Sequence, residues 1–325
     1  MPSERRLRVL LLARDDRRPD GFAGVLHHRL SPEHDLRWWD PAAPARAQLA
    51  GVDVVLDVGT HPDGGRVLRA ADRLRLWQVN GTGHDHLDLP ELARRGVALA
   101  VCPGATGAQA VGEHALALLL ALTRRLPEAE AAFRAGSWQE PAGGEVGGSV
   151  VSVVGLGASG RVVATALGAL GAHVVAVTRR PPDPLPAGVS EAVGVDRLDD
   201  VLPRSAAVLL HVPLTEQTRG LLDRRRLALL PRGAHVVNVA RGGVLDEQAA
   251  LAALRAGRLG GLGLDVFATE PVTDPETHPG LNLVRTAHVA GRTPGTAARR
   301  AEVVADNLAR LAAGLPPLHG VPLAA

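Results

Sequence analysis

Three segments late in the chain carry an arginine, a glutamate and a histidine, side chains that together can bind an anion and move a proton. The segments are Asn238-Val-Ala-Arg241-Gly-Gly, Gly263-Leu-Asp-Val-Phe-Ala-Thr-Glu270-Pro and Thr286-Ala-His288-Val-Ala-Gly. Each begins in or just after an apolar run that predicts a buried strand, and open α/β folds place their chemistry beyond the carboxyl ends of strands. We therefore expect Arg241, Glu270 and His288 to converge on one crevice. Taken singly, they could instead be a surface cation, a solvated loop acid and a hydrogen-bonded core imidazole.

A glycine-rich turn provides a second candidate site. Gly155-Leu-Gly157-Ala158-Ser159-Gly160 directly follows the apolar run Val150 to Val154 and opens a helical stretch that reaches Leu170. In such a turn the first glycine permits a tight bend, the second lets the backbone approach a pyrophosphate, and the third lets the helix pack on the strand. The helix N-terminus adds amide donors for the phosphates. The segment predicts a dinucleotide site, and a glycine-rich turn without a ligand is the alternative.

The apolar pattern supplies the strands and helices that would position these segments. Short β-rich runs alternate with helical patterns in the first third of the chain. The expected strands are Leu7 to Ala13, Leu36 to Asp40, Val52 to Val58, Leu74 to Val79 and Val97 to Cys102. A helix is expected from Val111 to Arg125, and a loop from Gly136 to Gly148, which is rich in glycine.

A second series of strands is expected beyond that loop. Its members are Val150 to Val154, His173 to Val177, Ala207 to Val212, His235 to Val239, Leu262 to Val266 and Val284 to Thr286. The tail from Arg299 to Ala313 has a helical period, and we expect it to fold back onto the first unit. Strands that alternate with helices predict an α/β protein with two doubly wound, Rossmann-like parallel sheets.

The composition argues against a nucleic-acid partner, although the sequence pI is about 9.7. All 36 basic residues are arginine, they face 34 acids, and the formal net charge is only +2. Because the chain has no Lys or Tyr, almost no group titrates between neutral pH and the pKa of arginine. The small excess of arginines over acids is therefore enough to give a high pI. Lys, Ile and Tyr have AT-rich codons, so their absence reflects codon usage and not function.

Cys102 is the single cysteine, so we expect no internal disulfide, no metal site and a reducing compartment. The apolar run Val9 to Ala13 is too short for a secretory signal. The best apolar stretch, Ala115 to Leu122, is also far shorter than the roughly 20 residues of a membrane helix. We expect a cytoplasmic protein with no membrane partner.

Together with further stretches, these segments resemble the D-2-hydroxyacid dehydrogenase family, which includes phosphoglycerate, lactate and glyoxylate/hydroxypyruvate enzymes. The further stretches are Gly81-Thr-Gly83-His-Asp85-His-Leu-Asp88, Pro103-Gly104, Val111-Gly-Glu113-His114, Gly144-Glu-Val-Gly-Gly148, His211-Val-Pro-Leu-Thr215 and Val244-Leu-Asp246-Glu247. The resemblance covers Leu74 to Thr293, and it is specific because several motifs occur in the same order. It implies an oxidoreductase that moves a hydride between a nicotinamide cofactor and a small 2-oxo or D-2-hydroxy acid, and a homodimer joined through the cofactor domains.

The resemblance makes His288 the acid/base, Glu270 its partner and Arg241 the group that binds the substrate carboxylate. These roles are physically reasonable, because hydride arrival builds alkoxide charge that a protonated imidazole can neutralise. A neighbouring carboxylate favours the protonated imidazole. The backbone amides of Thr82 and Gly83 would bind the same substrate carboxylate, with Thr82 near the nicotinamide.

The same resemblance divides the chain into two domains with the active site in the cleft between them. Residues 1–102 and 292–325 would form the substrate-binding domain, and residues 103–291 the dinucleotide-binding domain. Asp265 matches the position that holds the nicotinamide carboxamide. Further cofactor contacts are expected from Thr82, Val212, Thr218, Val239, Ala240, Arg241, His288 and Gly291, whereas His114 and His211 are expected to be structural.

Thr178-Arg179-Arg180 predicts which nicotinamide cofactor is preferred. An acid at the end of this strand, about 20 residues past the glycines, binds the ribose hydroxyls of NAD. Two guanidiniums and a hydroxyl instead suit a 2′-phosphate, so we expect NADP to be preferred and NAD to be the alternative. In an arginine-rich chain, Arg179 and Arg180 could also be solvated loop charges.

The sequence allows alternatives for the role of Arg292, for the function and for the substrate. Arg292, four residues after His288, could bind a second anionic group on the substrate or form an exposed salt bridge. A nucleotide-sensing module of the corepressor type on the same scaffold is the alternative function. A relation to formate dehydrogenases is weaker, because that branch has Gln where Glu270 stands. Glyoxylate, hydroxypyruvate and bulkier 2-oxo acids all remain candidate substrates.

Overall fold

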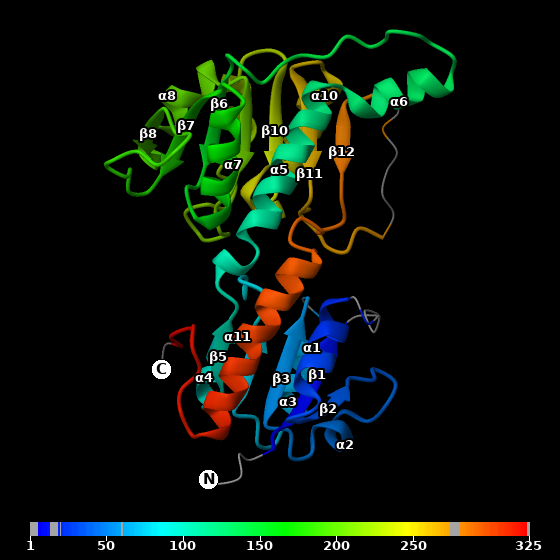
Figure 1. Cartoon of the computed structure of the whole chain (residues 1–325), viewed down its shortest axis with the longest axis vertical. Helices are drawn as coiled ribbons and strands as arrows, with labels where there is room; N and C mark the ends of the chain where they lie inside the picture. The colour runs from blue at the N-terminus through cyan, green and yellow to red at the C-terminus, as the bar shows by residue number, and fades with distance from the viewer. Residues whose placement is uncertain are drawn as a thin grey trace. The chain divides into compact units, whose positions relative to one another are not determined.

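The computed structural model describes residues 6–13, 19, 21–59, 61–273, 278 and 280–323, and it divides into two compact units (Figure 1). Unit 1 is Met1–Thr106 with Arg292–Ala325, and unit 2 is Gly107–Gly291. The first division falls after Thr106, four residues beyond the expected boundary at Cys102. Within unit 1, Arg299 Nε donates a hydrogen bond to the Thr106 carbonyl (2.8 Å) at the end of the turn Gly104–Thr106. No helix of the described residues is long and apolar enough to cross a membrane.

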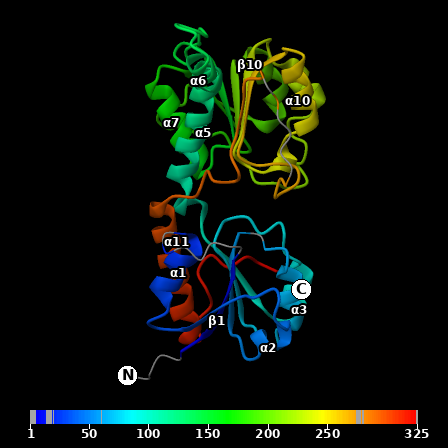
Figure 2. The same ribbon diagram turned by 90° about the vertical axis from the view of Figure 1, so that its right-hand side faces the viewer.

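Unit 1 is a five-stranded parallel sheet in the order β2-β1-β3-β4-β5. The strands are β1 (Arg8–Ala13), β2 (Asp35–Trp38), β3 (Val54–Val58), β4 (Leu76–Val79) and β5 (Ala98–Val101). Helices α1 (Phe22–Leu30) and α11 (Pro294–Ala312) cover one face, and α2 (Ala45–Leu49), α3 (Gly64–Ala70) and α4 (Leu89–Arg94) cover the other (Figure 2). In β1, Val9 and Leu11 enter one core while Leu10 and Leu12 enter the other, which explains its unbroken apolar run.

Unit 2 is a seven-stranded parallel sheet in the order β12-β11-β10-β9-β6-β7-β8. The strands are β6 (Val150–Val154), β7 (His173–Thr178), β8 (Glu191–Gly194), β9 (Ala207–Leu210), β10 (Ala234–Asn238), β11 (Leu259–Leu264) and β12 (Leu283–Arg285). Helices α5 (Ala108–Thr123) and α7 (Ala158–Ala169) cover one face, and α8 (Leu198–Val201), α9 (Arg224–Leu229) and α10 (Glu247–Arg255) cover the other. A further helix, α6 (Leu126–Arg134), follows α5. The chain reverses its direction of winding between β6 and β9, which is where such folds bind ligands.

The two doubly wound sheets confirm the predicted fold class, and every predicted strand is present. The tail helix packs in the core of unit 1 as expected, but it begins at Pro294 and not at Arg299. The Thr293 hydroxyl accepts the Thr296 amide hydrogen (3.2 Å), and a proline in the first helical turn costs no hydrogen bond. The short edge strand β8 and the helix α6 were not predicted.

Candidate active site

The glycine turn after β6 has the shape that a pyrophosphate requires. Gly155 has a positive φ of 102°, and a Cβ at Gly160 would overlap the Gly155 carbonyl oxygen. A Cβ at Gly157, by contrast, would have no neighbouring atom within 4 Å. The first and third glycines are therefore required by packing, whereas the second leaves open space at the N-terminus of α7. This space fits the diphosphate of a dinucleotide, with the backbone of Ala158 and Ser159 in the first turn of the helix.

Asp265 organises the segment that carries His288. The carboxylate follows β11, is 1% exposed, and accepts hydrogen bonds from the Thr286 hydroxyl (2.6 Å), the Val289 amide (2.8 Å) and the Ala290 amide (3.0 Å). The Asp265 carbonyl also accepts the His288 amide hydrogen (2.8 Å). His114 on α5 extends the network through its Nε2, which lies 2.9 Å from the Thr286 hydroxyl. These bonds fix the backbone on both sides of His288.

His288 and Glu270 form a close pair. Nδ1 of His288 lies 2.6 Å from Oε2 of Glu270, and Oε1 of Glu270 accepts the Phe267 amide hydrogen (2.9 Å). Burial acts to raise the pKa of Glu270, but the hydrogen bond and charge of His288, the Phe267 amide and the charge of Arg241 lower it below its ordinary value. Glu270 is therefore ionised at neutral pH and holds Nδ1, which leaves Nε2 to exchange a proton with a reactant.

Arg241 follows β10 on a turn closed by the buried Asn238. The Asn238 side chain donates to the Arg241 carbonyl (3.0 Å) and accepts the Ala240 amide hydrogen (3.0 Å). A Cβ at the next residue, Gly242, would overlap the Phe267 carbonyl, so this turn packs directly against the segment that leads to Glu270. The structure thus brings together Arg241, Glu270 and His288. A cation, a carboxylate and an imidazole so placed can hold an anionic reactant and transfer a proton to it.

Sequence reasoning gave no supporting role to Glu247, His86 or Asp57, which hold loops of the predicted site in place. Glu247, in the first turn of α10, accepts the Ala268 amide hydrogen (2.8 Å) and so fixes the segment before Glu270. In unit 1, the loop after β4 that carries Thr82 and Gly83 is anchored by His86, whose Nε2 lies 2.8 Å from Oδ2 of the buried Asp57. Trp77 Nε1 donates to the same oxygen (3.2 Å). No linear spacing links Asp57 to His86, so only the fold reveals this contact.

The remaining predicted site residues are divided between the two units. Thr82 and Gly83 belong to unit 1, where the Thr82 hydroxyl donates to the Cys102 carbonyl (3.2 Å). In unit 2, Val212 lies against Gly155, and Val239 and Ala240 are buried. The Thr218 hydroxyl donates to the Pro213 carbonyl (2.6 Å) within its own loop, and Gly291 is the last residue of the unit.

Thr178, Arg179 and Arg180 line a recess of about 300 Å³ at the carboxyl end of β7. Both arginines are exposed, and neither has an ion-pair partner among the described residues. The recess follows the strand next to β6, so it lies on the side of the glycine turn where the ribose of a dinucleotide is expected.

Other polar groups are less suited to a catalytic role. Burial raises the pKa of the Cys102 thiol to about 11, so it is not a thiolate at neutral pH. The described residues contain no group of three or more His, Cys, Asp or Glu that could hold a metal ion. Nδ1 of His211 lies 3.0 Å from the Ser159 hydroxyl, beside the glycine turn.

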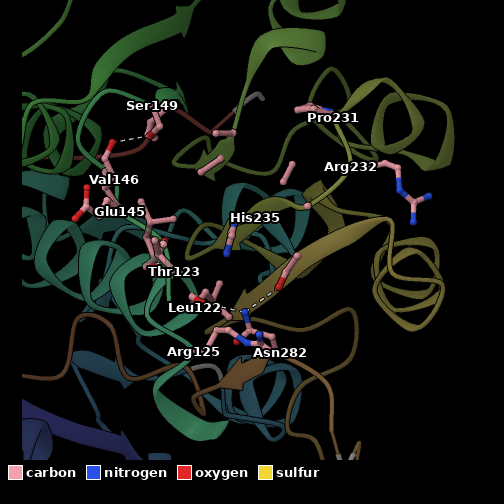
Figure 3. A pocket seen from close by; sticks show the side chains of 18 residues that line it. Leu122, Thr123, Arg125, Glu145, Val146, Ser149, Pro231, Arg232, His235 and Asn282 are labelled. Atoms are coloured by element: carbon pink, nitrogen blue, oxygen red, sulfur yellow. Dashed lines mark hydrogen bonds between the residues drawn. The ribbon is translucent and has the colours of Figure 1, made fainter. Parts of the chain in front are cut away.

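A hollow of about 480 Å³ lies at the opposite edge of the same sheet (Figure 3). It is lined by residues at the amino ends of β6, β9, β10 and β11, together with Leu122 and Thr123 of α5. His235 stands in the middle of it, and Asn282 donates to the carbonyls of Leu122 (2.9 Å) and Gly260 (2.8 Å). Arg241, Glu270 and His288 follow the carboxyl ends of strands, so this hollow is not part of the candidate active site.

Comparisons with known proteins match these features. The family model described as D-isomer specific 2-hydroxyacid dehydrogenase, NAD binding domain, matches residues 116–290. The chain is 36% identical over 294 residues to D-3-phosphoglycerate dehydrogenase of Mycobacterium leprae, which covers 88% of this chain and 54% of that protein. It is 32% identical over 295 residues to glyoxylate reductase of Thermofilum pendens, with 87% and 86% covered.

A solved structure is similar over nearly its whole length. The NADPH-dependent glyoxylate/hydroxypyruvate reductase of Sinorhizobium meliloti, in complex with NADP and malonate, gives a TM-score of 0.81 at 27% identity, and 98% of this chain and 97% of that chain are covered. The chain spans about half the length of the phosphoglycerate dehydrogenases that it matches.

His211, whose Nε2 is shielded from solvent, predicts a pH dependence of stability. Burial lowers its pKa from 6.5 to about 4, so between these values the unfolded chain binds a proton that the folded protein does not. The contribution of His211 is fully present above pH 6.5 and is lost as the pH falls toward 4. From pH 6.5 to 4, the unfolding free energy should fall by about 3 kcal/mol more in the wild type than in His211→Gln.

Denaturant unfolding of both proteins across this pH range measures the difference. Ser159→Ala serves as the control, because it removes the hydrogen-bond partner but not the desolvation of the imidazole, and it should keep the wild-type pH dependence. Parallel curves for the wild type and His211→Gln would contradict the prediction.

Proposed function

Because the chain belongs to the D-isomer specific 2-hydroxyacid dehydrogenase family, we propose that it transfers a hydride between a nicotinamide cofactor and a small 2-oxo acid or D-2-hydroxy acid. The observation that carries this proposal is the 2.6 Å contact between His288 and Glu270, with the charge of Arg241 close enough to act on the same carboxylate. Reduction of a ketone needs a proton donor, a partner that keeps the donor oriented, and a cation for the acid group.

Each residue has a distinct role in the proposed reaction. Nε2 of His288 donates a proton to the oxygen that gains negative charge, and Glu270 holds Nδ1 and compensates the imidazolium. Arg241 binds the substrate carboxylate, and the amides of Thr82 and Gly83 are assigned to the same carboxylate. When bound, the nicotinamide supplies the hydride. The Asp265 carboxylate is proposed to hold its carboxamide.

The activities for which related proteins are named guide the choice of substrate. Glyoxylate reductases and a glyoxylate/hydroxypyruvate reductase align along most of this chain. We propose a glyoxylate/hydroxypyruvate-type reductase, located in the cytoplasm. A panel of 2-oxo acids, followed by loss of reduced cofactor absorbance, tests the reaction, and no turnover with any acid would favour a nucleotide-sensing module instead.

NADP is proposed as the preferred cofactor. Support comes from Arg179 and Arg180, which have no carboxylate partner among the described residues and line the recess beside Thr178. A 2′-phosphate would give both guanidiniums a charged, forked hydrogen-bonding partner. An acid that could accept the ribose hydroxyls of NAD is absent from Thr178-Arg179-Arg180.

A homodimer formed through unit 2 is also proposed. Helix α6 buries none of its residues, and Leu126, Phe133 and Trp138 are 53%, 67% and 78% exposed on it and just after it. In Figure 1 this helix and the loop that follows it lie at one end of the sheet of unit 2. Exposed aromatic side chains on one short segment mark an interaction surface, and the hollow shown in Figure 3 lies in the same unit. A second copy of the chain would cover both with a self-complementary contact.

Replacing the proposed proton donor tests the mechanism. His288→Ala should lower kcat by about 10² to 10⁴-fold, the usual contribution of general acid catalysis, while the affinity for reduced cofactor changes little. Steady-state rates and cofactor fluorescence titration measure the two effects. Wild-type kcat in His288→Ala would remove His288 from the reaction.

The cofactor proposal predicts that kcat/KM with NADPH exceeds that with NADH by at least about tenfold, or roughly 1.4 kcal/mol. The triple variant Thr178→Asp, Arg179→Ser, Arg180→Ser should reverse the preference, because it adds a ribose acceptor and removes the phosphate ligands. Arg197→Ser is the control, since Arg197 pairs with Asp200 (3.0 Å) elsewhere in unit 2 and should not affect the ratio. Equal or better efficiency of the wild type with NADH would return the assignment to NAD.

The dimer proposal predicts a solution mass of about twice 33.8 kDa, measured by light scattering after gel filtration. Phe133→Ser combined with Trp138→Ser should shift the protein to the monomer, because it removes the apolar area that drives association. Leu315→Ser provides the control, since Leu315 is 50% exposed but belongs to unit 1. A monomeric wild type would rule the dimer out.

A further inference from the structure

Arg300 of α11 is a largely buried cation in unit 1. One Nη atom donates to the Asn80 carbonyl (2.9 Å), and the guanidinium carbon lies 5.3 Å from the centre of the Phe22 ring. Its Nε is shielded from solvent and has no hydrogen-bond acceptor. Among the described residues, no carboxylate pairs with Arg300. Burial lowers the pKa of this guanidinium from its ordinary value.

A buried cation without a counter-charge destabilises a fold. Transfer of a charged group from water is costly unless an opposite charge or enough acceptors compensate it. The Asn80 carbonyl and the Phe22 ring provide only part of that compensation. An anion that binds beside Arg300 would provide the rest.

The surroundings of Arg300 suit an anion. Nδ2 of Asn80 is a second buried donor without an acceptor, while the Cys102 thiol lies 3.9 Å from Oδ1 of the same amide. The guanidinium of Arg292 also lies 5.3 Å from the Phe22 ring, so two cations share one aromatic side chain. An anion beside the Phe22 ring would therefore be close to both guanidiniums.

The location of the cluster connects it with substrate. Asn80 directly precedes the loop Gly81–Gly83, whose amides are assigned to the substrate carboxylate, and Phe22 begins the helix that follows β1. The crossovers that leave β1 and β3 run in opposite directions along the sheet, and open α/β folds bind ligands beyond the carboxyl ends of strands at such a point. Arg300 therefore lies at the ligand-binding edge of unit 1.

We propose that Arg300, with Arg292 beside it, binds a second anionic group at the far end of the substrate, so that this protein prefers dianionic 2-oxo acids. The inference rests on the proposed reductase function, but it replaces glyoxylate and hydroxypyruvate as the preferred substrates by 2-oxo acids that carry a second anionic group. The distal group is a carboxylate or a phosphate, because both accept forked hydrogen bonds from a guanidinium. Arg300 provides the charge from the core side, and Arg292 from the surface.

Substrate pairs that differ in the distal charge test the proposal. Oxaloacetate is compared with 2-oxobutyrate for a carboxylate, and 3-phosphohydroxypyruvate with hydroxypyruvate for a phosphate. In at least one pair, wild-type kcat/KM should favour the dianion by about tenfold or more, and Arg300→Met should reduce that ratio by about tenfold through KM. Both kcat/KM values are measured on the same enzyme preparation, so the fraction of folded enzyme cancels in their ratio. A partly unfolded variant therefore cannot produce the change.

Arg310→Met is the matched control, because Arg310 is a partly exposed residue near the end of the same helix, donates to the Pro316 carbonyl, and should leave both ratios at the wild-type value. If the wild type shows no preference for either dianion, or Arg300→Met lowers both members of a pair equally, Arg300 only supports the fold and the proposal is wrong.

Binding without turnover separates this inference from the proposed reaction. Calorimetric titration compares D-malate with D-2-hydroxybutyrate, and 3-phosphoglycerate with glycerate, in the wild type and Arg300→Met. If a dianion binds more tightly than its partner, and this difference is lost in Arg300→Met, the site is supported even when no acid is reduced. In that case only the proposed reaction would be wrong. Equal affinities within both pairs would overturn the site while leaving any measured reduction intact.

Discussion

The burial of one carboxylate, that of Asp265, is the constraint on which the candidate active site depends. A charge that is 1% exposed must be compensated, and Asp265 is compensated by the Thr286 hydroxyl and two backbone amides. All three donors belong to the segment around His288, so the backbone cannot leave this position without exposing unpaired groups. His288 itself has a φ of 53°, which is costly for a residue with a Cβ and is maintained by these bonds on both sides. The direction of the imidazole is therefore determined by a residue that need not touch the substrate.

Backbone packing also fixes the positions of the loops that carry Arg241 and Glu270. The turn that carries Arg241 contacts the Phe267 carbonyl so closely that Gly242 has no room for a side chain, and Glu247 fixes the adjacent amide of Ala268. Both loops follow neighbouring strands, β10 and β11, whose register is set by seven parallel strands. A cation and a carboxylate from distant parts of the chain thus acquire a fixed separation without a direct bond being needed between them.

The sequence could predict much of this, because parallel sheets and phosphate-binding turns have local signatures. Buried strands such as β1 read as apolar runs, and the glycines of the turn after β6 have required spacings. Elements without such a signature were missed: β8 is a half-buried edge strand of four residues, and α6 buries none of its own side chains. The start of α11 was placed too late because its signal, Thr293 followed by Pro294, is a cap and not a periodic pattern.

Contacts between distant residues lay beyond sequence reasoning for a different reason. His86, in the loop after β4, contacts the buried Asp57 of β3, and Arg300 lies beside Asn80, yet neither pair has a fixed spacing along the chain. In a chain whose basic residues are all arginine, the residue type alone also carries little information. What distinguishes one arginine from another is its partner. Arg94 and Arg95 lower the pKa of Glu91 to about 2, and Arg225 and Arg226 do the same to Asp199.

Arginines that pair on the surface in this way satisfy their charge within the protein, and such exposed pairs add little to stability. Arg179, Arg180 and Arg300 have no such carboxylate among the described residues, and all three follow or adjoin the carboxyl ends of parallel strands. Arg179 and Arg180 are exposed, so water solvates their charges and they do not destabilise the fold when no ligand is bound. Arg300 is largely buried, and water cannot compensate it to the same degree. The lack of a partner is therefore informative at both sites, but it is a stronger physical argument for a bound anion at Arg300 than at the exposed pair.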